Sequence, residues 1–252
     1  MAKEAKTCKS SIVYPGECKS LCGPSIWLMK PVADGTSTEV VIGGRIYNIM
    51  IATGRSTLIA STTGVKIVSR EGAWEFQEIP IREAAKLLVF LECDREESAY
   101  PTAAGEKRWR EPVIDATGDL NVRNFERWLI GRAVKRDPAD APLFDFLRAQ
   151  ETYGLVRFLL KEHNAITSIA KLSQRYGVSE SHFRRLCRQA LGKGLKRELR
   201  QWRAAMAVLD VVESGESLTQ VASSHGFSSS SHFSREIRDL FGFSPSQVRR
   251  RL

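Results

Sequence analysis

Arginines and serines recur at helical spacing near the end of the sequence. Within the stretch 227–242, one side of a helix would carry Ser230, Ser231, Ser234, Arg235 and Arg238. The other side would carry Phe233, Ile237, Leu240 and Phe241 and would face a core. A guanidinium is a planar fork of donors that matches guanine O6 and N7 in the major groove, and short serines allow close approach to phosphates. Taken alone, the stretch is more typical of an ordinary solvated helix face.

The same pattern occurs fifty residues earlier, and this repetition favours DNA recognition. Ser181-His-Phe-Arg-Arg185 aligns with Ser231-His-Phe-Ser-Arg235. The outward side of the earlier copy would carry Ser181, Arg184, Arg185 and Arg188, and its inward side Phe183, Leu186, Cys187, Ala190 and Leu191.

A shorter segment with apolar periodicity precedes each copy, at 168–176 and 217–225, and a glycine closes it. Ser217 and Gln220 have the spacing of a capping box, which marks a helix start. A short helix, a tight turn and a longer basic helix form the helix-turn-helix pattern. The sequence therefore predicts two such units.

The segment between the two units predicts one long helix. Residues 194–214 contain no proline and carry a stripe of Leu195, Leu199, Trp202, Met206 and Leu209. At 1.5 Å per residue this helix would span about 31 Å, close to the roughly 34 Å turn of B-DNA. The two basic helices could then enter successive major grooves. Ser244-Pro245 predicts a last short helix, which ends in Arg249-Arg-Arg251 as a phosphate-contacting or solvated tail.

These residues resemble the AraC/XylS family of bacterial transcription regulators. The resemblance rests on Val221-Ala222, Gly226-Phe227, Ser231–Arg235, Gly242 and Ser244-Pro245. More narrowly, residues 176–187, 198–203 and 231–237 are similar to the InvF-type activators of type III secretion and invasion genes. The resemblance is close over 165–248. It implies that Arg185 and Arg235 read bases, although the family often has a larger residue at the position of Ser181.

The resemblance also implies partners. They are double-stranded promoter DNA, RNA polymerase and a type III secretion chaperone of tetratricopeptide type acting as co-activator, and a homodimer is possible. On this hypothesis Arg184, Arg188, Arg238 and Lys196 contact phosphates. The sequence itself shows only amphipathic helices and apolar patches that could form a protein interface.

The charge is unevenly distributed along the 252 residues. Residues 151–252 contain 17 lysines and arginines against 9 acidic residues, whereas residues 1–150 contain 21 against 20. Nearly all of the net charge of +9 therefore lies in the repeat region, as in nucleic-acid-binding modules. No secretory signal or long apolar run is found, so we expect a cytoplasmic protein without membrane contact, whose five cysteines are free thiols.

The first half predicts a small β-rich domain. Residues 1–36 are expected to be a mobile lead-in whose apolar patch, 26–29, docks on the β-rich region beyond it. Gly43-Gly44 between two β-branched runs predicts a hairpin, and further strands are expected at 57–61, 65–69 and 74–79, in a small barrel or curled sheet. Helices are expected at 80–93 and around 122–129, with a long mobile loop at 94–119 between them.

The predicted fold class is α+β. A regulatory or interaction domain, 1–137, precedes an all-α DNA-binding domain, 138–252, with a joint near 138–142 and the first helices of the second domain at 143–160.

Parts of the sequence also suggest other functions. Cys8, Cys18 and Cys22 suggest a zinc site, and a branch of the wider family transfers methyl groups to such a cysteine, but no histidine occurs before His163. No catalytic motif is found, and a pairing of Cys187 with His182 or His232 is less expected than a buried structural thiol. We therefore expect no enzyme, no metal and no cofactor. The remaining alternative is a small-molecule sensor whose ligand binds the β-rich half.

Overall fold

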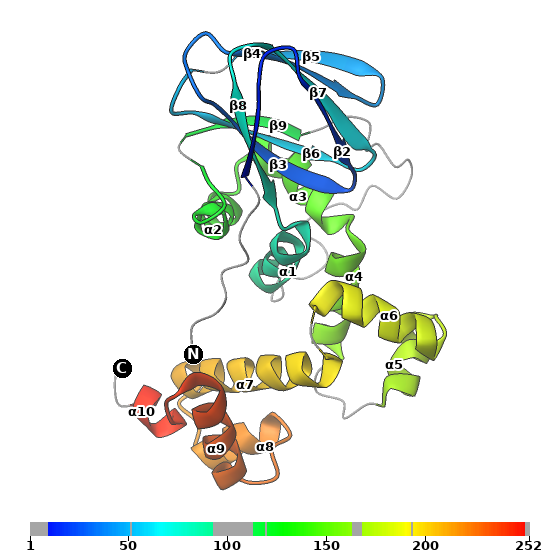
Figure 1. The fold of residues 1–252 in the computed structure, drawn as a ribbon. Coiled ribbons are helices and arrows are strands. Elements are labelled where there is room, and N and C mark those ends of the chain that lie inside the picture. Colours follow the sequence, from blue (N-terminus) through cyan, green and yellow to red (C-terminus); the bar gives the residue numbers. More distant parts are fainter. Residues whose placement is uncertain are drawn as a thin grey trace. The chain divides into compact units, whose positions relative to one another are not determined.

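The computed structural model describes residues 10–50, 52–92, 113–118, 120–162, 168–192 and 194–249. The chain divides into two compact units, Met1–Tyr153 and Gly154–Leu252. The first combines β-sheets with helices and the second is helical, so the predicted α+β class is confirmed (Figure 1).

The first unit contains two antiparallel sheets where the sequence predicted a barrel or one curled sheet. The five-stranded sheet has the order β1 (Ser10–Val13), β8 (Trp74–Ile79), β3 (Ser25–Pro31), β6 (Ser56–Ser61) and β9 (Val113–Thr117). The four-stranded sheet has the order β2 (Cys18–Cys22), β7 (Gly64–Glu71), β4 (Ser37–Ile42) and β5 (Arg45–Met50).

The two sheets pack face to face around a shared apolar core. Trp74 and Phe76 from β8 meet Val40 from β4 and Ile67 from β7 in this core. On the other side of the five-stranded sheet lie helices α1 (Ile81–Glu92), α2 (Phe125–Lys135) and α3 (Ala141–Arg148), as Figure 1 shows. That sheet is therefore a middle layer, and this explains why every residue of β6 is buried.

The expectation of a mobile lead-in at 1–36 is wrong for residues 10–36. They form β1, β2 and β3, and β3 lies in the centre of its sheet, paired with both β6 and β8. The patch 26–29 is thus part of a strand that is covered on both faces. Strands of this kind show a continuous apolar run rather than alternation, so the run resembled a docking patch. Residues 1–9, with Cys8, lie outside the described residues.

The other predicted strands are confirmed. The hairpin of β4 and β5 turns at Gly43 and Gly44, whose φ values are 56° and 81°. Two successive positive φ values are what a two-residue hairpin turn of this type requires.

The helices of the first unit agree with the sequence in place and differ in length. The expectation of a loop over 94–119 is wrong for 113–117, which form β9 and pair with β6. The rest of that segment lies outside the described residues, except Gly118. After α2, the 3-10 helix η2 (Pro138–Asp140) and α3 lie within the first unit, as does the first turn of α4 (Glu151–Lys161). The division into a regulatory or interaction domain, 1–137, and a DNA-binding domain, 138–252, stays a prediction.

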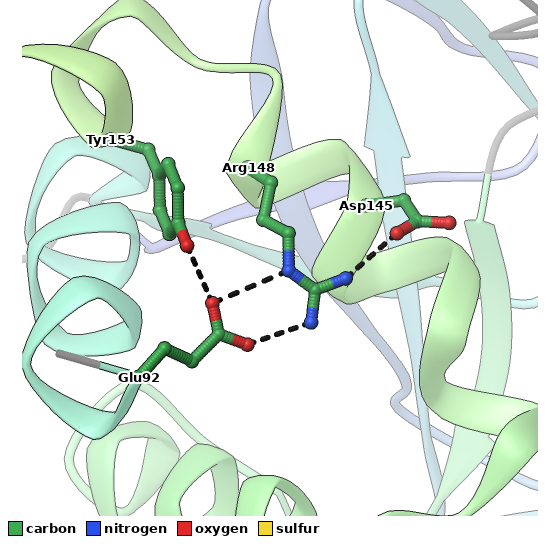
Figure 2. A network of polar contacts seen from close by, with 4 residues as sticks. All are labelled: Glu92, Asp145, Arg148 and Tyr153. Carbon is green, nitrogen blue, oxygen red and sulfur yellow. Dashed lines mark hydrogen bonds and ion pairs between the residues drawn. The ribbon is translucent and has the colours of Figure 1, made fainter. Parts of the chain in front are cut away.

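A partly buried polar network joins the last turn of α1 to α3 and to the start of α4 (Figure 2). Arg148 donates to both oxygens of Glu92, at 2.7 and 3.3 Å, and the hydroxyl of Tyr153 donates to Glu92 at 2.6 Å. Arg148 also pairs with Asp145 at 2.7 Å. Burial lowers the pKa of Arg148, but the hydrogen bond and charge of Glu92, together with Asp145 and Tyr153, outweigh it and raise the pKa. All four residues belong to the first unit.

The second unit contains the rest of α4 and, among the residues that the structure describes after it, six further helices. They are α5 (Ile169–Tyr176), α6 (Glu180–Leu191), α7 (Leu195–Glu213), α8 (Leu218–Ser224), α9 (Ser230–Phe241) and α10 (Pro245–Arg249). The pairs α5–α6 and α8–α9 lie near opposite ends of α7 (Figure 1). Both predicted helix-turn-helix units and the long connecting helix are present.

The buried face of α7 differs in part from the predicted stripe. Trp202 is buried, but Leu209 is 50% exposed, and the helix packs on α8 and α9 through Ala204, Ala207 and Val211. Small side chains let neighbouring helices approach closely, and a pattern of large apolar residues does not reveal them.

Candidate nucleic-acid interface

The two basic helices, α6 and α9, begin and end in the same way. Ser179 and Ser229 are the N-caps, and their hydroxyls accept from the amides of His182 and His232 at 3.3 and 3.0 Å. Gly192 and Gly242 end the helices in the left-handed conformation that glycine adopts at least cost. These shared caps set where each helix begins and ends, and the buried apolar face of each helix determines which side chains point outward.

The first helix of each helix-turn-helix unit, α5 or α8, has the end signals that the sequence predicted. Ser168 caps α5, and Gly177 ends it with a φ of 80°. Ser217 and Gln220 form the capping box of α8 in both directions. The last helix, α10, starts at Pro245 behind Ser244, whose hydroxyl accepts from the amide of Gln247 at 3.4 Å.

The inward face of α6 is anchored by aromatic rings. Phe183 is fully buried, and its ring centroid lies 5.7 Å from that of Tyr176 in α5 and 6.3 Å from that of Phe158 in α4. Cys187 is buried on the same face, as predicted, and burial raises the pKa of its thiol to about 11. A thiol with this pKa stays protonated at neutral pH, so its role is packing.

The outward face of α6 carries the predicted set of polar residues. Ser181, Arg184, Arg185 and Arg188 are all exposed. Arg184 is held by Glu180, one turn earlier, at 2.5 Å. Arg185 and Arg188 form no ion pair with any other residue that the structure describes, so their guanidinium groups are available to a ligand.

The outward face of α9 carries Arg235, Arg238 and Ser231 exposed, with Ser230 and Ser234 half-buried. Inward, Phe233 and Ile237 are fully buried in the core that α7, α8 and α9 share. Phe241 departs from the prediction: it is exposed and stacks on Phe243, with ring centroids 5.8 Å apart. The residue lies in the last turn of α9, and its neighbours Leu240 and Phe243 pack on the core instead.

Polar contacts that no sequence pattern predicted join α9 and α8 to α7. Arg200 of α7 donates to the buried carboxylate of Glu236 at 2.7 Å, and the His232 imidazole lies 3.4 Å from the same carboxylate. His225, at the end of α8, contacts Asp210 of α7 at 2.6 Å. The spacing of Arg200, one helical turn after Lys196 on the predicted long helix, was the one sequence feature that could have placed it on the same basic face.

The other residues that the sequence singled out lie outside α6 and α9. Lys196 is exposed in the first turn of α7. Arg249 donates to the carbonyl of Glu216, and Arg250 and Arg251 lie outside the described residues. Cys18 and Cys22 are exposed free thiols on β2, and within the described ranges no cluster of three possible metal ligands occurs. Among the described helices, none is both long enough and apolar enough to cross a membrane.

The sequence matches a family model and curated relatives. A model of the family described as "Helix-turn-helix domain" matches residues 172–251. The "Invasion protein InvF" of Salmonella typhimurium is 38% identical over 175 residues, which are 69% of this chain and 80% of InvF. The "Transcriptional regulator MxiE" of Shigella flexneri is 41% identical over 104 residues, which are 40% of this chain and 50% of MxiE. A crystal structure of an AraC-type regulator from Chromobacterium violaceum covers 40% of this chain and 90% of that one, with a TM-score of 0.37 and 25% identity.

Proposed function

Since the chain belongs to the AraC-type family of helix-turn-helix transcription regulators that includes InvF and MxiE, we propose that it activates transcription by reading two adjacent major-groove segments of a promoter. The observation that carries this proposal is the pair of equally capped helices, α6 and α9, each with outward arginines that lack a protein partner among the described residues. Binding, rather than catalysis, is the function.

The outward residues divide into two roles. Arg185 and Arg235 occupy the same position in the two repeats and contact base edges, where a bidentate arginine distinguishes guanine from the other bases. Arg184, Arg188, Arg238 and Lys196 contact phosphates, which fix the position of the protein without reading sequence. Ser181, Ser230, Ser231 and Ser234 are small enough to let both helices lie close to the DNA.

The target genes are those of type III secretion and invasion, and the protein acts in the cytoplasm. Their transcription requires RNA polymerase and a tetratricopeptide-type secretion chaperone that binds the N-terminal half. The boundary between this half and the DNA-binding domain lies at 137/138. Support for a protein partner comes from large apolar side chains exposed on the first unit. On β5 these are Ile46 and Met50, and on α2 they are Ile130 and Val134.

A promoter-binding assay tests the DNA-binding proposal. The purified chain is titrated into duplexes of the secretion-gene promoters and into shuffled duplexes of the same composition, at several salt concentrations. We expect a preference of at least about a thousandfold for one promoter segment. Equal affinity for both sets of duplexes would refute sequence-specific binding.

Reporter transcription with and without the chaperone tests the partner. We expect activation only when both proteins are present and co-elute from a sizing column. Full activation by the regulator alone, together with a failure to co-elute, would remove the chaperone from the proposal while leaving the DNA-binding assay untouched.

A second candidate function, ligand sensing, is favoured by one observation. The indole nitrogens of Trp27 and Trp74 and the hydroxyl of Tyr47 are buried at the core between the sheets, without a hydrogen-bond partner in the described part of the chain. The Lys19 ammonium lies 5.8 Å from the Trp27 ring. Unpaired buried donors are costly, and a hydrogen-bond acceptor on a bound apolar molecule, such as a carboxylate, would reduce that cost at any donor it reached. Thermal-shift measurements with aliphatic and aromatic acids test this: no stabilisation by any acid at millimolar concentration would reject the candidate.

A further inference from the structure

The basic side chains of α7 are gathered in its first half. Lys196, Arg197, Arg200 and Arg203 precede the buried alanines, whereas Asp210 and Glu213 lie toward the far end. Lys196, Arg200 and Arg203 are four and then three residues apart, so they share one face of the helix. This basic stripe lies on the helix that connects the two reading helices.

Within the stripe, Arg200 is the residue held by a buried acid. Its Nε donates to Oε1 of Glu236, at 2.7 Å, and the Glu236 side chain is only 7% exposed. Glu236 follows Arg235 directly on α9, so the contact joins the connecting helix to the reading helix. His232, which hydrogen-bonds Ser228 at 3.1 Å, approaches the other carboxylate oxygen.

The buried carboxylate is not needed to pack the repeat. In the first repeat the same position is occupied by Leu186, which is buried against its own unit. Burying a carboxylate where leucine suffices costs desolvation free energy, which only a well-placed partner offsets. The charge at Glu236 therefore serves something besides the core.

The Arg200 guanidinium is the group that this charge holds in place. Its side chain is 52% exposed, and only Nε is engaged by a described residue, so both terminal nitrogens remain available to a ligand. A guanidinium whose inner nitrogen is fixed by an acid can still donate two parallel hydrogen bonds to a phosphate. Fixing it beforehand reduces the rotamer entropy that is lost on binding.

We propose that Arg200 contacts a DNA phosphate from the connecting helix, and that Glu236 is a positioning residue that aims it. This inference rests on the proposed function and adds a contact between the two reading helices. Because Glu236 belongs to α9, the pair also joins the connecting helix to the second reading helix.

Salt dependence of binding tests the phosphate contact. Arg200→Met is compared with wild type on the preferred promoter duplex and on shuffled duplexes, by fluorescence anisotropy at several salt concentrations. We expect about fivefold weaker binding to both kinds of duplex and a log–log salt slope smaller by about 1, with the preference unchanged. Arg70→Met is the matched control, because Arg70 is 57% exposed and pairs with Glu39 in the first unit; its slope should equal that of wild type.

A double-mutant cycle tests the positioning role. Glu236→Leu gives the second repeat the residue of the first, so folding should be retained, and thermal unfolding checks this. The effect of Arg200→Met is then measured in both backgrounds. We expect Arg200→Met to weaken DNA affinity about fivefold in the wild-type background and less than about twofold in the Glu236→Leu background. Without Glu236 to hold it, the Arg200 side chain should contribute little to binding.

The outcomes separate the proposals. An unchanged salt slope in Arg200→Met overturns the phosphate contact, and equal losses in the two backgrounds overturn the role of Glu236. A wild-type protein without any preference among duplexes would instead refute the proposed function.

Discussion

Equivalent arginines in the two repeats have different surroundings. Arg185 is followed by the buried Leu186, and its neighbour Arg184 is held by Glu180. Arg235 is followed by Glu236, which is bound to the connecting helix. The outward arginine of α9 therefore lies beside an ion pair with α7, whereas that of α6 lies beside an apolar contact.

Arg235→Ala should relax the specificity of the protein. Losing a bidentate contact to guanine costs about 1–3 kcal/mol of discrimination at one base pair, while affinity for unrelated DNA falls much less. Selection of bound duplexes from a randomised pool measures this at each position. Arg185→Ala, the matched variant, should relax a different position in the other half of the site. A pool from Arg235→Ala that matches the wild-type pool would exclude Arg235 from reading.

Cys187 should be the slowest of the described thiols to react. Burial raises its pKa to about 11, so the thiolate fraction at pH 8 is far below that of an ordinary cysteine, whereas Cys18 and Cys22 are exposed. With a thiol-disulfide reagent at pH 8, Cys187→Ser should leave the number of fast-reacting thiols unchanged. Because the raised pKa belongs to the folded state, reactivity should grow only as the pH approaches 11 or as the chain unfolds. One fewer fast thiol in the variant would contradict this.

Secondary elements could be predicted from sequence where one face is buried and the ends carry a chemical mark. The basic helices have an apolar stripe, a serine cap and a glycine end, and both were located from those features. β3 could not be, because a strand buried on both faces lacks the alternation that identifies strands. Similarly, Arg200 and Glu236 lie 36 residues apart, and only the packing of α9 on α7 brings them together.

The buried network around Glu92 should stabilise the first unit. In Arg148→Met, the Glu92 carboxylate would remain buried without its main partner, and the free energy of unfolding should fall by about 3 kcal/mol. Urea unfolding followed by tryptophan fluorescence suits this measurement, because four of the five tryptophans lie in the first unit. Arg70→Met, which breaks an exposed pair, should cost less than about 1 kcal/mol. Similar costs for both variants would show that the network adds little.

The excess of lysine and arginine after residue 150 and the two repeats lie in the same unit, where one continuous helix, α7, connects α6 and α9. Under the proposed function, the length of this helix sets the distance between the two half-sites on the promoter.

Lengthening α7 should change the preferred site in a calculable way. One residue inserted between Arg197 and Glu198 would rotate the second repeat by about 100° relative to the first and should abolish binding to the bipartite site. Twenty-two residues, close to six full turns, would restore the direction and add roughly 33 Å, which is about one turn of B-DNA. Selection should then recover sites with the half-sites about 10 base pairs further apart. Recovery of the original spacing, with the fold intact by circular dichroism, would contradict a rigid connection.

Helix α4 starts in the first unit and ends in the second, and this has a consequence for anyone who wishes to separate the two. A fragment starting at Gly154 would lack Tyr153 and the opening turn of a helix whose later residues, Leu155 and Leu159, are fully buried. A fragment starting at Pro138 would keep that turn but leave Glu92 behind, depriving Arg148 and Tyr153 of their shared acid. Each cut removes either the first turn of α4 or the acid that Arg148 and Tyr153 share, so weak DNA binding by such a fragment would report lost folding stability as well as lost recognition.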